Sequence, residues 1–221
     1  MFYIDGYADK YQKLNGFEVK VKTSEGDKIG HISMKPTTRA AYDLSMRENT
    51  VDGLITMDEI EKLKSGYLYT IKEDPSNIYF IQTLSLWEQQ LKTKNFNAIR
   101  CNCKITVRRK GFEDDMADES WIEVYKDVCA SISETLSDSK NFNAGFEVTT
   151  IKVIQLPIWQ IETDEETGEI TEKVREIKEN DSIEVKNLIS NDLICYIHVE
   201  SVDNFGISGT IKLQGTQDMR I

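Results

Sequence analysis

The clearest structural signal in the chain is the stretch Ile99-Arg100-Cys101-Asn102-Cys103-Lys104-Ile105-Thr106-Val107-Arg108. Apolar side chains occupy every second position, and polar or charged side chains lie between them. This period of two predicts one half-buried β-strand over residues 99–108. Shorter stretches repeat the pattern at 17–22 and at 122–132, where Lys126 interrupts it. The first part of the chain is therefore expected to be largely antiparallel sheet.

Two short helices are expected between these strands. Residues 38–47 and 57–64 have helix-forming composition. Thr56 followed three residues later by Glu59 fits a capping box, and Ser65-Gly66 marks a helix end.

The composition limits the classes of function. The chain has 221 residues, with 38 acidic and 27 basic side chains and a net charge of −11. That charge disfavours binding to DNA or to an anionic membrane by bulk electrostatics. The first nine residues lack the pattern of a signal peptide, and no apolar run reaches the roughly 18 residues that span a bilayer. We therefore expect no export and no membrane partner.

Four cysteines without a CxxC pattern predict reduced thiols and a cytoplasmic place of synthesis.

A polar stretch at 137–143 predicts two domains, residues 1–140 and residues 141–221. The second part holds 15 acidic and 7 basic residues. It contains about six short apolar stretches separated by turn signals, a spacing typical of an immunoglobulin-like β-sandwich. One five-residue segment occurs twice in the chain. Lys94-Asn95-Phe96-Asn97-Ala98 recurs at 140–144, and this second copy spans the predicted boundary. Coincidence, a shared way of starting a strand and a shared interface role all remain open as explanations.

The best ligand candidate is the twelve-residue stretch 48–59, read as a calcium loop. Glu48 takes the first position, Asp52 the fifth, Gly53 the turn, and Glu59 the bidentate twelfth position. Glu48 is long for its place, and Thr50 supplies no charge. A plain turn with a tight reversal at Asp52-Gly53 is therefore the favoured interpretation. No metal and no cofactor are expected.

Catalytic patterns are missing from the sequence. There is no GxSxG motif, and no pattern marks His31 or His198 as a base. We therefore predict no catalytic residues and no enzymatic activity. The cluster Arg108-Arg109-Lys110, followed by Gly111-Phe112 and an acidic run, is expected to pair with itself or with a partner protein.

Several stretches together resemble the head-closure or head-to-tail adaptor (stopper) proteins of tailed bacteriophages. The resemblance rests on 18–22, the Asp52-Gly53 stretch, Gly66-Tyr67-Leu68-Tyr69-Thr70-Ile71, Ile78-Tyr79-Phe80-Ile81 and 99–109. It implies a small antiparallel β-barrel with short helices in the N-terminal domain. It also implies that residues 144–221 resemble the immunoglobulin-like domains that decorate virion proteins.

The same resemblance implies a structural virion protein, assembled in the host cytoplasm as a homo-oligomeric ring in the phage neck. The ring would contact the portal or adaptor and the tail, and DNA would pass its lumen without specific binding. Its interface candidates are Asp52, Leu54, Arg108, Arg109, Lys110 and Phe112. Two alternatives stay open: another tail or baseplate ring protein, and an extracellular adhesin-type binding module that uses the possible calcium loop.

Overall fold

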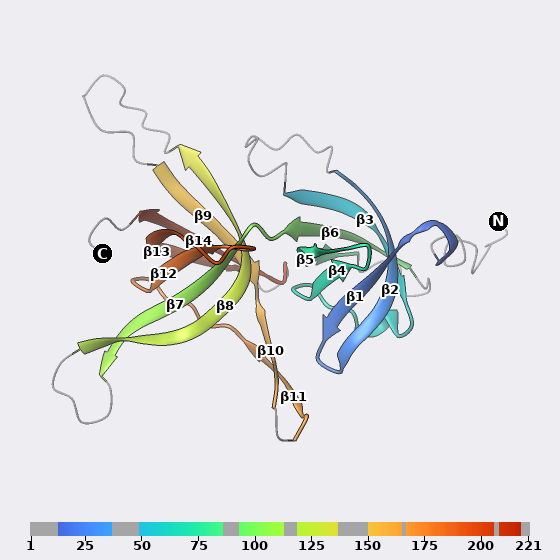
Figure 1. Ribbon diagram of the computed structural model, residues 1–221, viewed down its shortest axis with the longest axis horizontal. Coiled ribbons are helices and arrows are strands. Elements are labelled where there is room, and N and C mark those ends of the chain that lie inside the picture. Colours follow the sequence, from blue (N-terminus) through green and yellow to red (C-terminus); the bar gives the residue numbers. More distant parts are fainter. Residues whose placement is uncertain are drawn as a thin grey trace. The chain divides into compact units, whose positions relative to one another are not determined.

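The computed structural model describes residues 13–36, 49–85, 93–112, 119–136, 150–164, 167–205 and 208–217. In these residues the regular structure is mainly β, as expected, and most strands belong to two closed six-stranded sheets (Figure 1). The chain divides into two compact units. Unit 1 comprises 1–101, 157–175 and 205–210, and unit 2 comprises 102–156, 176–204 and 211–221.

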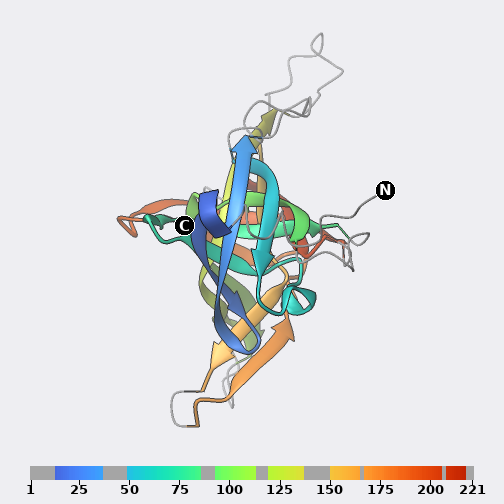
Figure 2. The ribbon, with the colours of Figure 1, turned by 90° about the vertical axis from the view of Figure 1, so that its right-hand side faces the viewer.

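The sheet of unit 1 is a closed antiparallel barrel in the order β1-β2-β3-β6-β5-β4. Closure pairs every strand on both sides, which removes free sheet edges. The twisted ribbon of β1 and β2 faces the viewer in Figure 2. The strands are β1 (Phe17–Thr23), β2 (Gly26–Pro36), β3 (Thr50–Met57), β4 (Leu68–Ile71), β5 (Asp74–Leu84) and β6 (Thr93–Arg100).

Alternating side chains fill the interior of this first barrel. Val19 and Val21 of β1 are buried, and the lysines on either side of Val21 are exposed. Tyr69 stacks on Tyr79 with ring centroids 5.1 Å apart, and the Tyr69 and Phe96 rings are nearly perpendicular with centroids 5.9 Å apart. These aromatic pairs belong to one apolar cluster, which anchors β4, β5 and β6 together.

The expected helix at 57–64 is only a single 3₁₀ turn, η1 (Ile60–Lys62). Thr56 does not cap it, because this residue lies buried in β3 and pairs with His31 and Thr93. Gly66 has a φ of 91° and lies in a turn before β4, and it does not end a helix as expected, because η1 already ends at Lys62. The other expected helix, at 38–47, lies outside the described residues.

The sheet of unit 2 is also a closed barrel, in the order β12-β13-β14-β9-β8-β7. Buried apolar residues occupy every second position in two of its strands, Ile105 and Val107 in one and Ile183 and Val185 in the other, and the polar residues between them, Thr106 and Glu184, are also buried. The interruption at Lys126 is a bulge beside Asp127, whose φ is 51°. The strands are β7 (Cys103–Phe112), β8 (Glu119–Leu136), β9 (Thr150–Pro157), β12 (Ser182–Asn187), β13 (Leu193–Phe205) and β14 (Thr210–Gln217).

The hairpin of β10 (Trp159–Thr163) and β11 (Ile170–Val174) belongs to unit 1, although it follows β9 in the chain (Figure 1). Trp159 Nε1 donates to the Ser65 carbonyl at 2.9 Å. The Lys64 ammonium lies 5.2 Å from the centre of the same indole and pairs with Glu172 at 2.6 Å. These contacts attach the hairpin to the segment that precedes β4.

The predicted strand over 99–108 is in fact two strands. The Cys101 N–H donates to Ile78 of unit 1, whereas the Asn102 N–H donates to Ala130 of unit 2. The alternation continues through this junction because each barrel buries the side chains at its own end of the stretch. The junction at 101/102 is the first boundary between the units.

The domain boundary expected at 140/141 is therefore corrected. It falls between β8 and β9, which are hydrogen-bonded neighbours in the second barrel. Residues 141–221 supply only β9, β12, β13 and β14 to that barrel, because β7 and β8 complete it and β10–β11 return to unit 1.

Candidate partner-binding site

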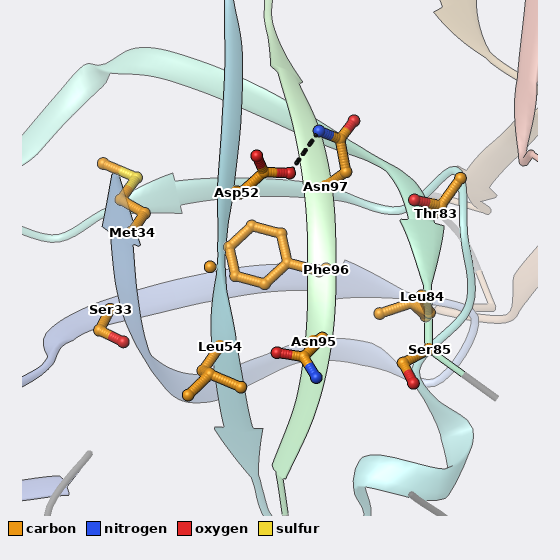
Figure 3. A pocket seen from close by; sticks show the side chains of 11 residues that line it. Ser33, Met34, Asp52, Leu54, Thr83, Leu84, Ser85, Asn95, Phe96 and Asn97 are labelled. Atoms are coloured by element: carbon orange, nitrogen blue, oxygen red, sulfur yellow. Dashed lines mark hydrogen bonds between the residues drawn. The ribbon is translucent and has the colours of Figure 1, made fainter. Parts of the chain in front are cut away.

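A hollow of about 890 Å³ crosses β2, β3, β6 and β5 of the first barrel (Figure 3). It combines aliphatic side chains, one aromatic ring and a set of small polar side chains. The lining residues are Ser33, Met34, Asp52, Gly53, Leu54, Thr83, Leu84, Ser85, Asn95, Phe96 and Asn97.

The hollow depends on Gly53, at the centre of β3. Gly53 pairs with Met34 on one side and with Phe96 on the other. A Cβ atom on Gly53 would lie 2.3 Å from the Ser33 carbonyl oxygen and 2.9 Å from Cε1 of Phe96. The missing side chain thus lets the Phe96 ring lie against the β3 backbone. Asp52-Gly53 is not the expected turn, because both residues pair within the sheet.

Both polar and aliphatic side chains line the hollow. Asp52 Oδ1 accepts a hydrogen bond from Asn97 Nδ2 at 2.9 Å, between directly paired positions of β3 and β6. Met34 and Leu84 pack against the apolar core of the barrel. Of the lining side chains that the structure describes, Asp52 alone is charged. The hollow therefore suits an uncharged or basic group with aliphatic carbon, such as a projecting protein loop.

The proposed calcium loop is not a loop in the structure. Residues 50–57 form β3 and pair with neighbours on both sides, so the chain does not wrap around an ion there. Asp52 is the one carboxylate in this strand, and it accepts a hydrogen bond from Asn97. Glu48 lies outside the described residues. In the described part of the chain, no group of three or more His, Cys, Asp or Glu side chains is placed to hold a metal.

Glu59 instead joins a ring of four alternating charges at the η1 turn. Lys28 contacts Glu59 at 3.0 Å and Glu25 at 3.5 Å, and Lys62 contacts Glu25 at 2.8 Å and Glu59 at 3.2 Å. The hydrogen bonds from Lys28 and Lys62 lower the pKa of Glu59 below its ordinary value. Glu59 has a φ of 60°, so its backbone adopts a left-handed conformation. The cluster ties the β1–β2 hairpin to the segment before β4.

The predicted basic cluster lies in unit 2 and is largely engaged within it. Arg108 Nη2 pairs with Glu184 at 2.6 Å, and Arg109 makes two contacts of 2.8 Å with Asp181. The Lys110 ammonium lies 5.4 Å from the centre of the Trp121 ring. Phe112 ends β7, but its side chain is outside the described structure.

The structure thus places the interface candidates in two groups. Asp52 and Leu54 line the hollow of unit 1, while Arg108, Arg109 and Lys110 stabilise unit 2. Sequence reasoning did not assign Asn95, Phe96 and Asn97 to this site. Their signal was the repeated Lys-Asn-Phe-Asn-Ala segment, whose first copy begins β6. The second copy lies outside the described residues.

The two histidines and Cys103, the remaining candidates for chemical reactivity, lie in paired strands of the two barrels. His31 and His198 lie in β2 and β13, at half-buried positions of paired strands. Burial raises the pKa of the Cys103 thiol to about 12, and its sulfur lies 3.4 Å from the Ala130 carbonyl oxygen. At this pKa the thiol stays protonated near neutral pH and is a poor nucleophile.

Comparisons of the chain with protein families, with curated protein sequences and with solved structures found no match. Within the described ranges, no helix is long and apolar enough to cross a bilayer.

Proposed function

We propose that this chain is a structural protein of a tailed-bacteriophage virion that forms a ring in the head-to-tail connector. The observation that carries the proposal is the first barrel. Strands β1 to β6 form a closed antiparallel barrel, which supports the resemblance, and two interface candidates, Asp52 and Leu54, line its hollow. A barrel without free edges presents its loops and hollows, rather than strand edges, to partners.

In this proposal the chain acts mechanically and catalyses no reaction. Copies assemble with one another beneath the portal or adaptor, and the ring then docks the tail. The net charge of −11 suits a channel that DNA passes without binding, because an acidic wall repels phosphate. The second barrel takes the decorating role that the sequence suggested for an immunoglobulin-like sandwich. The expected location is the virion, after assembly in the host cytoplasm.

The first test is the gene neighbourhood followed by a deletion. We expect the flanking reading frames to encode portal, capsid and tail proteins. A phage lacking this reading frame should produce separate heads and tails under the electron microscope, and the wild-type gene supplied on a plasmid should restore joined particles. Intact virions formed without the chain would refute the proposal.

The same experiment separates the connector from other ring positions. A tail or baseplate protein would leave a different defect, in which the tail is missing or truncated while the neck is complete. The adhesin alternative loses its calcium site, because residues 50–57 form β3. That alternative would predict a normal particle that fails to adsorb to its host.

A further inference from the structure

The turn between β12 and β13 presents aliphatic side chains to solvent. We call residues 188–194 the apolar tip. Ile189 is 80% exposed, Leu193 is 51% exposed and Ile194 is 52% exposed. Hairpin turns are ordinarily built from Gly, Asn, Asp, Ser and Pro, and single exposed apolar residues are common. Three strongly exposed aliphatic residues lie within six positions, in the turn and at the start of β13, and such a cluster of exposed apolar side chains is a candidate site of contact.

Hydrogen bonds hold the apolar tip in one conformation. Asn187 Oδ1 accepts from the backbone N–H groups of Ile189 at 2.9 Å and Ser190 at 3.1 Å. Asn191 has a φ of 58°, and its Oδ1 accepts from Lys104 Nζ at 3.0 Å. A rigid projection loses little conformational entropy when it binds, so this turn is organised for contact before any partner arrives.

The hollow of unit 1 has the complementary character. Its aliphatic residues Met34, Leu54 and Leu84 can receive aliphatic side chains, and its Asn and Ser side chains can pair with the backbone of a turn. The charges also match, since Asp52 is the charged residue described in the hollow and Lys104 is the cation bound to the apolar tip.

We propose that the apolar tip of one copy occupies the hollow of the next copy. Each chain then contributes its second unit to one neighbour and the hollow of its first unit to the other neighbour. Such a contact joins two different surfaces, so it propagates, and it closes into a ring when the rotation allows. The inference rests on the proposed function for the presence of many copies side by side, and it names the contact that joins them.

The experiment compares the self-association of the full-length chain with that of three variants by sedimentation velocity over a concentration series. Ile189→Asp removes the tip contact at a position that is already in water. Leu54→Asp places a charge in the hollow. Ile29→Asp is the matched control, because Ile29 is 63% exposed in unit 1 and does not line the hollow. Far-ultraviolet circular dichroism checks that each variant is folded.

We expect the wild type and Ile29→Asp to form multimers, and both site variants to lose association by about tenfold or more, which corresponds to the loss of one good contact. An equimolar mixture of Ile189→Asp and Leu54→Asp should form dimers and nothing larger. In that mixture one intact tip and one intact hollow remain for each pair of chains. If Leu54→Asp fails to fold, Thr83→Trp replaces it, because Thr83 is exposed and a large ring there fills the hollow.

Three results would overturn the inference: a wild type that stays monomeric, an Ile189→Asp variant that assembles normally, or a mixture that forms no dimer. A contact between two tips would show as loss in Ile189→Asp with normal assembly of both hollow variants, and it would also overturn the inference. The phage deletion gives an independent answer. If the mixture forms dimers but the deletion phage still makes intact virions, the contact between the apolar tip and the hollow is supported and the neck location is refuted.

Discussion

Replacing Arg109 by methionine tests the buried ion pair of the second barrel. Arg109 Nε and Nη2 donate to the two carboxylate oxygens of Asp181 at 2.8 Å each, and the Asp181 side chain is 2% exposed. Methionine retains much of the aliphatic volume of arginine but carries no charge. The substitution therefore leaves a carboxylate inside the protein without the cation that faces it.

The expected cost follows from this geometry. Removing one partner of a buried pair costs about 3–5 kcal/mol. We expect the lower end, because the Arg109 side chain is 29% exposed and the Lys178 N–H still donates to Asp181 at 2.8 Å. A loss of about 3 kcal/mol corresponds to a fall in Tm of roughly 6–12 °C for a chain of this size.

Arg108→Met is the matched control on the same strand. Arg108 pairs with Glu184 at 2.6 Å, but Lys186 also contacts Glu184 at 2.6 Å, so this carboxylate keeps a cation after the substitution. We expect a loss below about 1 kcal/mol, as for partly exposed ion pairs.

Urea unfolding followed by circular dichroism and tryptophan fluorescence measures both losses. The double variant Arg109→Met/Asp181→Asn should be more stable than Arg109→Met alone, because it removes the unpaired charge. Equal losses for Arg108→Met and Arg109→Met, or no gain in the double variant, would refute the reasoning.

Three further outcomes are expected. Gly53→Val should lower the free energy of unfolding by about 3 kcal/mol, because its Cβ would lie 2.3 Å from the Ser33 carbonyl oxygen; an unchanged urea midpoint would contradict the close packing against Phe96. Glu59→Gln should be less stable than the wild type above pH 4.5, the ordinary pKa of the carboxyl group. Since the folded-state pKa of Glu59 is lowered, the difference should vanish as the pH falls through that lowered value, and a difference independent of pH would count against the charge cluster. Cys103 should resist iodoacetamide at pH 8 in the native protein and react after unfolding, because a thiol with a pKa of about 12 is ionised to only about one part in 10⁴; mass spectrometry of the labelled peptides reads this directly.

The β-rich class of the fold could be predicted from local patterns. Side chains of a strand point alternately to its two faces. When one face is buried, apolar and polar residues therefore alternate along the strand. Val19 and Val21 in β1 and Ile105 and Val107 in β7 are buried as that period indicates. The bulge at Asp127 also had a local sign, since Lys126 breaks the alternation in β8.

The candidate site was only partly accessible to such reasoning. Asp52 and Leu54 were singled out, but as members of a turn, because an Asp-Gly pair is the strongest short-range turn signal. Gly53 instead makes room for the Phe96 ring, 43 positions away in the numbering and directly opposite in the sheet. No local pattern distinguishes a glycine that turns the chain from a glycine that receives a distant ring.

The sequence by itself determined that the chain is β-rich and acidic, because strand periodicity and charge are properties of residues close together in the chain. Only the tertiary structure decided which strands share a barrel. The alternating stretch at 99–108 is continuous in sequence, yet Cys101 and Asn102 donate to different units. The two barrels, the return of β10–β11 to unit 1 and the hollow beside Gly53 all arise from hydrogen bonds and packing between residues far apart in the chain. Strand pairing depends on closure of the whole sheet. The residue pattern of a single strand does not show which strands will pair with it.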